Sequence, residues 1–431
     1  MSTTAAVRLW GTNIGAVSID DNTDVAAFQY EPAFLHSGIQ VSPITMPLRQ
    51  EPYSFPGLSR ESFRGLPGLL ADSLPDRFGN AIIDAWLAAE GRTPESFNVV
   101  ERLCYIGSRG MGAIEFTPQR GPRSTRSKDL QVDSLVQLAT EALTRRNEFI
   151  ASLKDGDQGV RDILLVGTSA GGARAKAVIA FNPATLEVRS GQVEAGPGFE
   201  YWILKFDGVV GNKDKELDDP QGYCAIEYAY ALMAREAGIS MTECRLLEEN
   251  GRRHFMTKRF DRMDDGSKVH MQSLAGLSHL DFNQPGANSY EQAFFAMRQL
   301  GLGSDLAEQQ FRRMVFNVVA RNQDDHVKNI AFLMNRRGSW TLAPAFDVTY
   351  AYNPTGVWTR EHQMSINGKR DGFELDDFRA CAEAAVLKRG SAELVLAEVQ
   401  EAVSRWREFA AIARVDEREI ERIQKAHRAF V

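Results

Sequence analysis

The segment Asn322–Asn329 reads Asn-Gln-Asp-Asp-His-Val-Lys-Asn and places seven polar or charged residues between two apolar segments, Met314–Ala320 and Ile330–Leu333. Burying so many polar groups is costly unless they are hydrogen-bonded or bind a ligand. One alternative is a solvated turn between a helix and a strand. A fold that contains this segment must therefore either expose it or build a site around it.

Two residues of this segment, Asp324 and Asn329, have the spacing Asp-x-x-x-x-Asn of a protein-kinase catalytic loop. In such a loop the Asp accepts the proton of the attacking hydroxyl, and the Asn holds a metal ion on the phosphates. Asp325 does not have this separation from Asn329. We therefore predict that Asp324 is the catalytic base.

A further carboxylate, Asp347, stands 18 residues after Asn329, at the end of an apolar run. The intervening segments Ile330–Met334 and Trp340–Leu342 are predicted to form a β-hairpin, which returns the chain toward the same place. Mg²⁺ requires few protein ligands but prefers hard oxygen atoms, so an amide and a carboxylate suffice. The position of Asp347 one hairpin after the loop predicts a magnesium site at Asn329 and Asp347.

A glycine-rich, basic segment, Gly167–Lys176, leads into a predicted strand, Lys176–Phe181. It is not a Walker A loop, because no Lys-Ser/Thr pair follows Gly172 and no helix is predicted there. Its backbone N–H groups, together with Arg174 or Lys176, are predicted to contact phosphate oxygens. The alternative is a tight turn with solvated basic residues.

Lys205 lies in a predicted strand, Tyr201–Phe206, on the face that also carries Ile203. An unpaired ammonium among apolar neighbours is costly, so Lys205 either reaches solvent or meets an anion. Glu227, on the predicted helix Ala225–Ala237, is the matching carboxylate for the Lys–Glu pair of active kinases.

The periodicity of the chain predicts an α+β protein with a two-lobed, protein-kinase-like fold and an extra small α+β domain at its start. Residues 1–120 form that leading domain, residues 121–260 a β-rich N-terminal lobe with the glycine-rich loop, and residues 261–431 a helical C-terminal lobe. The polar, basic segment Gly121–Lys128 is the predicted linker.

Several local elements are predicted within these parts. Asn250-Gly251 predicts a β-hairpin, and Gly238 predicts the end of the helix before it. The other predicted elements are strands at Val7–Trp10, Ala26–Tyr30 and Ala113–Phe116, helices at Ala81–Ala89 and Leu130–Leu153, a β-rich stretch from Ile163 onward, and one helical run from Val395 to Ala410.

Composition narrows the function classes. The net charge of −7 and the pI of about 5.7 argue against a general nucleic-acid binder. The four cysteines are widely spaced, with no CxxC pair, which predicts reduced thiols. Neither a signal peptide nor a run of roughly 18 apolar residues is visible. We therefore expect a cytoplasmic protein without a membrane partner.

Together these motifs resemble those of the HipA-type serine/threonine kinases, the toxin half of bacterial toxin–antitoxin pairs linked to persistence. The likeness covers essentially the whole chain. It is carried by Leu66–Gly79, Gly171–Lys176, Lys205, Arg259–Arg262, Asp324–Asn329 and Pro344–Asp347.

The resemblance implies ATP and Mg²⁺ as cofactors, Asp324 as proton acceptor, and Asn329 and Asp347 as the metal-holding residues. Ser169 matches the self-phosphorylated loop serine of the family, and Lys258 stands where the family has an acidic residue. The implied nucleotide contacts are Gly171, Gly172, Ala173, Arg174, Ala175 and Lys176 at the phosphates, Lys205 at the α- and β-phosphates, Lys258, Arg259 and Phe260 at the adenine and ribose, and His326, Val327, Lys328 and Phe346 beside the catalytic and metal-binding residues.

The resemblance also implies a function: a protein kinase acting on a component of translation, as family members act on aminoacyl-tRNA synthetases. It implies a helix-turn-helix antitoxin that meets the leading domain and supplies the only DNA contact, which agrees with the acidic pI. Two alternatives stay open. One is a small-molecule kinase, and the other is an inert ATP-binding scaffold or co-repressor.

Overall fold

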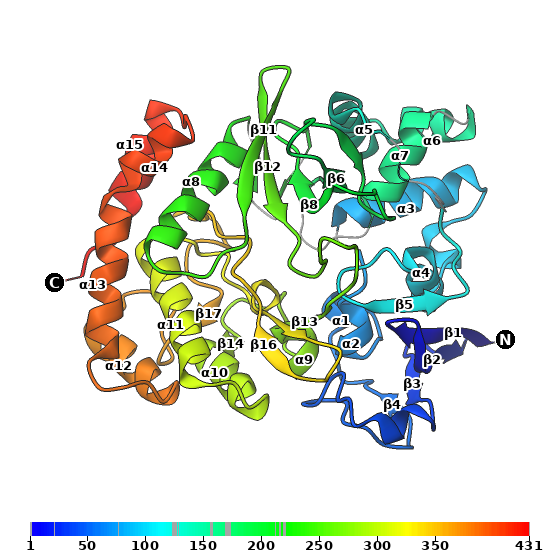
Figure 1. Cartoon of the computed structure of the whole chain (residues 1–431), viewed down its shortest axis with the longest axis horizontal. Coiled ribbons are helices and arrows are strands. Elements are labelled where there is room, and N and C mark those ends of the chain that lie inside the picture. Colours follow the sequence, from blue (N-terminus) through cyan, green and yellow to red (C-terminus); the bar gives the residue numbers. More distant parts are fainter. Residues whose placement is uncertain are drawn as a thin grey trace.

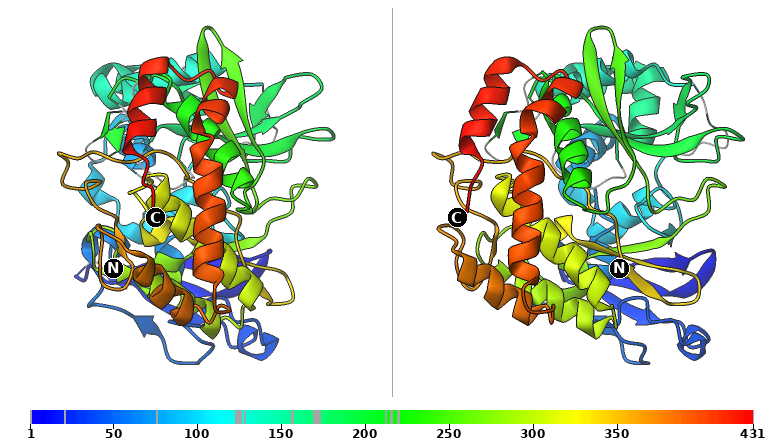
Figure 2. Two further views of the ribbon diagram at one scale, coloured as in Figure 1. Left: turned by 90° about the vertical axis from the view of Figure 1, so that its left-hand side faces the viewer. Right: turned by 60° about the vertical axis from the view of Figure 1, so that its left-hand side comes forward.

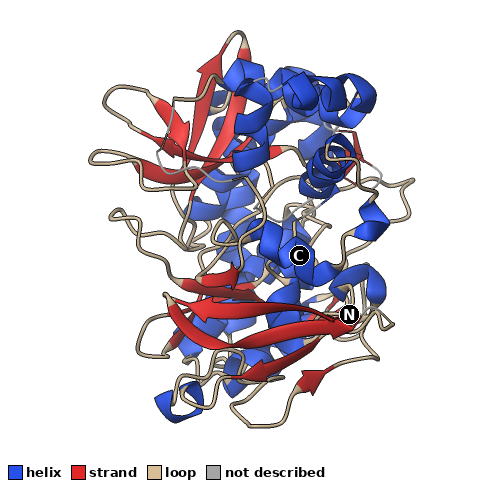
Figure 3. Ribbon diagram, turned by 90° about the vertical axis from the view of Figure 1, so that its right-hand side faces the viewer, coloured by secondary structure: helices blue, strands red, loops and turns tan. Residues whose placement is uncertain are grey.

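The computed structural model describes residues 2–430, except for residues 21, 76, 123–126, 128, 156–157, 169–173, 212, 215–216 and 219–220. The fold is of the predicted α+β class, with two lobes and an additional domain at the N-terminus. Figure 3 shows a β-sheet near each end of the molecule with helices between them. Figure 1 shows the helical lobe beside both.

The leading domain is built on an antiparallel sheet with the strand order β4-β3-β2-β1-β5. Alternate residues of β1 are buried, as expected for a strand with one face on a core. Two of the three strands predicted here are confirmed to within one residue, and the first begins at Ser2 rather than at Val7. Strand β2 was not predicted, because Asn13, Gly15 and Ser18 interrupt its apolar alternation. The bounds are β1 Ser2–Leu9, β2 Thr12–Asp20, β3 Ala27–Tyr30, β4 Tyr53–Ser54 and β5 Ile114–Thr117.

Helix α3 (Arg77–Ala89) packs both against the leading domain and against the helices that follow residue 120. It lies against α5 (Val132–Thr144), α6 (Arg146–Asp155) and α7 (Gln158–Val166), and its Phe78 shares their core. The other helices of the region are α1 Arg60–Phe63, α2 Gly68–Ala71 and α4 Val99–Ile106. The hydrophobic packing therefore continues across residue 120.

Two expectations for the following helices are wrong. The predicted helix Leu130–Leu153 is divided into α5 and α6, because Arg145 leaves helical geometry (φ −132°, ψ 53°) and α6 turns to pack on α3. Ile163, where a β-rich stretch was expected to begin, lies in α7 instead. Its fully buried side chain belongs to the face of α7 that packs on α5.

The N-terminal lobe contains an antiparallel sheet with the order β11-β12-β8-β6-β7. The predicted hairpin is confirmed: Asn250 and Gly251 have φ angles of 49° and 76°, which suit a type I′ turn. Helix α8 (Tyr223–Glu236) packs on β11 and β12, and Gly238 with φ 76° follows its end, as predicted. The strands are β6 Lys176–Phe181, β7 Val188–Ser190, β8 Glu200–Lys205, β11 Cys244–Glu249 and β12 Arg252–Lys258; β9 Lys213–Asp214 and β10 Leu217–Asp218 form a separate pair.

The C-terminal lobe is mainly helical, and its core extends into α8. The predicted hairpin after the polar segment is confirmed as β15 and β16. The helical run predicted from Val395 is interrupted at Arg405, where α13 ends and α14 begins; Figure 2 shows α13 along the outer face of this lobe. The bounds are β13 His270–Ser273, α9 Leu274–Ser278, β14 Asn288–Ser289, α10 Tyr290–Gln299, α11 Ser304–Val319, β15 Ala331–Met334, β16 Trp340–Leu342, β17 Met364–Ser365, α12 Leu375–Ala384, α13 Ser391–Ser404, α14 Trp406–Ile412 and α15 Glu417–Ala426.

The leading domain is fixed to the C-terminal lobe where α2 meets α9. A Cβ atom on Gly68 would lie 2.1 Å from the carbonyl oxygen of Gly276, so the two backbones touch. Asp72 accepts hydrogen bonds from the backbone N–H and the hydroxyl of Ser273, both at 2.7 Å. His279, whose pKa burial lowers to about 4, accepts a bond from the Gly68 N–H at 3.0 Å. These contacts bring the leading domain against the lobe that carries the polar segment.

Among the described residues, no helix combines the length and the apolar character needed to cross a bilayer.

Candidate active site

A cleft of about 720 Å³ lies where the leading domain and the two lobes meet, within the size range of small-molecule sites. Its wall from the leading domain includes residues between Leu69 and Asp84. The sequence-predicted residues that line it are Lys176, Lys205, Glu227, Lys258, Arg259, Phe260, Asp324, His326, Lys328, Asn329, Phe346 and Asp347. Residues more than 170 positions apart in the chain are thus brought together in one cavity.

Other predicted residues lie elsewhere. Arg174 is buried with its guanidinium 3.7 Å from the ring centre of Tyr223. Ala175 and Val327 are fully buried in the hydrophobic cores of the two lobes. Ser169, Gly171, Gly172 and Ala173 fall outside the described residues.

Two lysines stand side by side on the sheet of the N-terminal lobe. Lys176 of β6 and Lys205 of β8 are direct cross-strand partners, so their side chains leave the same face of the sheet. Like charges directly opposite each other are destabilising unless anions lie nearby. Here the anions are carboxylates: Lys205 Nζ lies 2.6 Å from Glu227 Oε1 and also forms an ion pair with Asp347. Of the two alternatives for Lys205, the structure shows the one in which it meets an anion.

The charge states of Lys205, Asp347 and Glu227 depend on one another. Burial opposes the charge on Lys205, but Asp347 and Glu227 outweigh burial and raise the pKa of Lys205 above its usual value. Burial would likewise raise the pKa of Asp347, but Lys205 and Lys176 bring it well below the ordinary range. Burial raises the pKa of Glu227 in spite of Lys205. Asp347 also has φ 56°, a left-handed conformation that is uncommon outside glycine and concentrated at functional sites.

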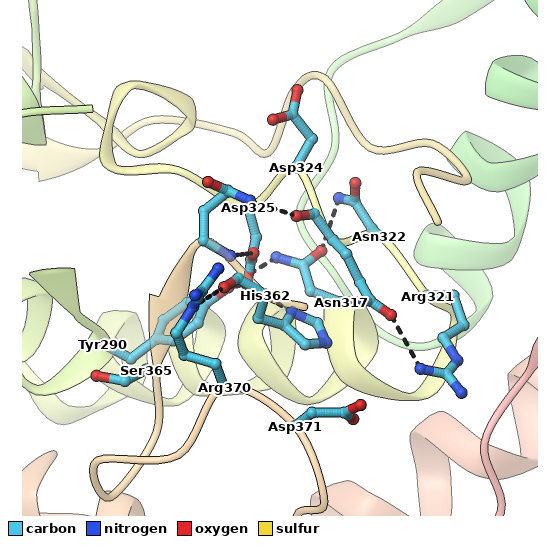
Figure 4. A network of polar contacts seen from close by, with 12 residues as sticks. Tyr290, Asn317, Arg321, Asn322, Asp324, Asp325, His362, Ser365, Arg370 and Asp371 are labelled. Carbon is cyan, nitrogen blue, oxygen red and sulfur yellow. Dashed lines mark hydrogen bonds and ion pairs between the residues drawn. The ribbon is translucent and has the colours of Figure 1, made fainter. Parts of the chain in front are cut away.

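The polar segment after α11 is not a solvated turn. Asp325 is buried and accepts three hydrogen bonds, from Tyr290 Oη at 2.7 Å, His362 Nδ1 at 2.8 Å and the Gln363 backbone N–H at 2.8 Å. Burial alone would raise the pKa of Asp325, but His362 and the hydrogen bonds from Tyr290 and Gln363 outweigh burial and lower the pKa. Figure 4 shows Asp325 within this polar network and Asp324 pointing away from it.

Asp324 is the aspartate that faces the cleft. Its Oδ1 accepts a hydrogen bond from the indole N–H of Trp358 at 2.7 Å, and its backbone oxygen accepts one from Asn329 Nδ2 at 3.0 Å. The Asp325 carboxylate points away from the cleft and accepts hydrogen bonds from Tyr290, His362 and Gln363. This division of roles favours Asp324 over Asp325 as the base.

The residues proposed for magnesium suit that ion. The amide nitrogen of Asn329 donates a hydrogen bond to the Asp324 backbone oxygen, so the amide oxygen of Asn329 points away from that backbone. Asp347 contributes a carboxylate to the same cleft. Within the described part of the chain, no three His, Cys, Asp or Glu side chains gather as a metal site. One amide and one carboxylate form a ligand set that Mg²⁺ completes with water and phosphate oxygens.

The junction between the lobes contributes an aromatic ring and two cationic side chains to the cleft. The ring of Phe260 packs against that of Phe346 with centroids 5.6 Å apart. Lys258 Nζ lies 2.9 Å from Glu200 Oε1, and the Arg259 guanidinium is held by Asp261 at 2.7 and 2.8 Å. Both cations are therefore engaged with carboxylates of the protein.

Asp261 has a second partner in the leading domain. Its Oδ2 accepts a hydrogen bond from the Gly112 N–H at 2.6 Å, while Arg262 donates to the Gly112 carbonyl at 2.9 Å. Burial would raise the pKa of Asp261, but Arg259 and Arg262 lower it far below the ordinary range. The motif Arg259–Arg262 thus ties the lobe junction to the leading domain.

Sequence reasoning missed the residues that hold the two aspartates. Trp358, His362 and Gln363 follow Asp324 and Asp325 by more than 30 residues, in a segment with no helical or strand periodicity. Tyr290 precedes them by a similar distance, at the start of α10. No local signal in the sequence relates these residues to the segment Asn322–Asn329.

Comparison with known proteins agrees with this architecture. The HipA N-terminal domain model matches residues 5–117, and the HipA-like C-terminal domain model matches residues 168–406. A curated relative, "Putative kinase Y4dM" of Sinorhizobium fredii (strain NBRC 101917 / NGR234), is 28% identical over 199 residues. That stretch covers 42% of this chain and 46% of the relative, so it spans less than half of the relative's length.

A solved structure resembles the whole chain. It belongs to the toxin–antitoxin complex of HipA, HipB and operator DNA from Shewanella oneidensis MR-1, and it matches with a TM-score of 0.69 over 98% of this chain and 95% of that chain. The sequence identity is 18%, so this likeness concerns the fold. The C-terminal domain model alone matches more than half of the 431 residues, and the chain therefore belongs to the HipA family.

Proposed function

We propose that this chain is an ATP- and Mg²⁺-dependent serine/threonine protein kinase. The observation that carries the proposal is the pair of cross-strand lysines, Lys176 and Lys205, which face the same cleft as Asp324. Two adjacent cations favour the binding of an anion, and the ion pairs of Lys205 with Glu227 and Asp347 hold its ammonium in the cleft. A polyphosphate is the substrate chemistry that suits such a site beside a proton acceptor.

In the proposed reaction, the oxygen of a serine or threonine hydroxyl attacks the γ-phosphorus of ATP. The bond from that phosphorus to the bridging oxygen breaks, ADP leaves, and the hydroxyl proton passes to the carboxylate of Asp324. Lys176 and Lys205 stabilise the charge on the phosphate oxygens, which is mainly positioning and electrostatic work. Mg²⁺, held by Asn329 and Asp347, would supply further charge neutralisation on the phosphates.

We further propose that the kinase is the toxin of a toxin–antitoxin pair. The Shewanella complex contains HipA, HipB and operator DNA, and family membership supports an equivalent helix-turn-helix partner for this chain. The net charge of −7 agrees with DNA contact through that partner alone. By the same family relation, the proposed substrate is a component of translation such as an aminoacyl-tRNA synthetase, with autophosphorylation at Ser169.

Incubation with γ-labelled ATP, Mg²⁺ and a cell lysate tests the proposal, with the Asp324→Asn variant as control. Label on a protein band that depends on Asp324 would support it, and the identity of the band would name the target. Label on a small molecule alone would instead indicate a small-molecule kinase. ATP binding without any transfer would overturn the proposed activity and indicate an inert scaffold.

A further inference from the structure

The segment that follows Asp347 returns to the catalytic loop and contacts three consecutive residues of it. Gln323 Nε2 donates to the Arg360 carbonyl at 2.9 Å, Trp358 donates to Asp324, and the Gln363 N–H donates to Asp325. This segment is long and lies between β16 and α12 without a helix of its own. Such a segment keeps a single position over the loop only if specific contacts fix it.

The anchoring contacts lie on the side of Asp325. His362 Nδ1 is 2.8 Å from Asp325 Oδ2, and His362 Nε2 is 3.3 Å from the guanidinium of Arg428. A guanidinium only donates hydrogen bonds, so Nε2 is the acceptor and Nδ1 carries the proton toward Asp325. The backbone N–H of Arg428 donates to the Val319 carbonyl at 2.9 Å, and its guanidinium forms an ion pair with Asp371. The segment is therefore fixed to the end of α11 and to the C-terminal residues.

With the segment anchored in this way, Trp358 is placed at Asp324. The indole N–H is a donor only, and it occupies Oδ1 of the carboxylate at 2.7 Å. Gln363, whose backbone N–H donates to Asp325, also donates from its side-chain Nε2 to the Trp358 carbonyl. This second hydrogen bond fixes the backbone that carries the indole. Rotation of the carboxylate about the Cβ–Cγ bond of Asp324 would break its hydrogen bond to Trp358.

We propose that Trp358 is a positioning residue whose hydrogen bond to Oδ1 holds the Asp324 carboxylate in the orientation in which it receives the proton of the acceptor hydroxyl. The inference rests on the proposed kinase function. A general base must meet the proton at a defined distance and direction, and a hydrogen bond to one carboxylate oxygen fixes the orientation of the whole group. The opposite role, in which the indole blocks the base, is an outcome that the experiment below distinguishes.

The kinetic test replaces the indole by a ring without the N–H. Trp358→Phe should lower kcat on the order of 10-fold, the scale of one hydrogen bond to a charged group, and leave the nucleotide Kd unchanged. In the Asp324→Asn background the same substitution should cause no further loss, because Trp358 acts through Asp324. Trp340→Phe is the matched control, since the Trp340 indole donates to the Gln40 carbonyl outside the cleft at 3.3 Å.

Additive losses in the double variant, or a lower melting temperature that accounts for the loss of kcat, would show a merely structural role and overturn the inference. A higher kcat in Trp358→Phe would show a blocking role and also overturn it. If the wild-type chain transfers phosphate and Trp358→Phe has the same kcat, the inference fails while the proposed function stands. If the wild-type chain transfers none, the proposed function fails and the inference fails with it.

The contact itself is measured without any activity. The chain has six tryptophans, so the indole N–H resonance of Trp358 is assigned by its loss in Trp358→Phe. This resonance should move in Asp324→Asn, whereas that of Trp406, which donates to the Ile420 carbonyl, should not. A Trp358 resonance that stays in place would overturn the inference.

Discussion

Replacing Lys205 by methionine, which keeps the length of the side chain but removes its charge, should destabilise the protein strongly. The ammonium lies 2.6 Å from Glu227 and pairs with Asp347, and the side chains of Lys205 and Glu227 are only 11% and 2% exposed. Removing one member of a buried ion pair leaves its partner uncompensated and typically costs about 3–5 kcal/mol. Here two carboxylates would face each other, so we expect the free energy of unfolding to fall by an amount in this range.

The matched control is Lys258→Met. Lys258 pairs with Glu200 at 2.9 Å, but these side chains are 24% and 23% exposed, and partly solvated pairs contribute only about 0–1 kcal/mol. Urea unfolding of both variants measures the difference, and isothermal calorimetry with ATP should show a loss of nucleotide affinity for Lys205→Met. Equal, small losses of stability in the two variants would refute the reasoning that Lys205 is needed to compensate the buried charges of Glu227 and Asp347.

The effect of Lys205→Met should also depend on pH in one direction. Burial already raises the pKa of Glu227, and removal of Lys205 takes away a charge that opposes this rise. A carboxyl group with a raised folded-state pKa binds its proton more tightly in the folded state, so stability falls as pH rises through that pKa. The destabilisation should therefore be smaller at pH 5 than at pH 8, and the opposite trend would contradict the assignment.

Three further predictions follow from the site and the core. Asp324→Asn should reduce phosphoryl transfer on the order of 10²–10⁴-fold with ATP binding nearly unchanged, whereas Asp325→Asn should mainly lower the melting temperature; an active Asp324→Asn variant would show that the base is misassigned. Asn329→Ala and, more severely, Asp347→Ala should weaken nucleotide binding measured by calorimetry in the presence of Mg²⁺, and equal wild-type affinity with and without Mg²⁺ would count against this site. Burial lowers the pKa of His270 to about 4, so the unfolded state binds its proton first and the free energy of unfolding should fall by about 2 kcal/mol per such histidine between pH 7 and pH 5; His270→Gln should flatten that slope in urea titrations, and an unchanged slope would exclude His270 as its source.

Elements with a local cause were predictable from the sequence. The hairpin at Asn250-Gly251 needs positive φ angles that these residues tolerate, and Gly238 ends its helix for the same reason. The hairpin after the polar segment followed from two short apolar runs. The polar segment Asn322–Asn329 could be recognised as a site because burying its polar groups costs free energy that specific partners must offset.

Elements that depend on residues far away in the chain could not be predicted from the sequence. Nothing near residue 80 shows that α3 packs with α5, α6 and α7 beyond residue 120, because its apolar face suits any hydrophobic partner. The same holds at the site. The partner of Asp324 is an indole 34 residues later, placed there by the buried contacts of Asp325 and His362 rather than by any spacing. Side chains brought in by a loop without periodicity are visible only once the fold is known.

The glycine contact between α2 and α9 limits how this molecule can open. Gly68 and Gly276 meet backbone to backbone, with no layer of side chains that could slide or repack between them. Helix α9 also packs against residues Val327–Asn329 of the polar segment. The leading domain, α9 and the segment Val327–Asn329 are consequently packed against one another without a gap. An opening of the cleft that moved the leading domain away from the residues Val327–Asn329 would therefore have to break these backbone contacts.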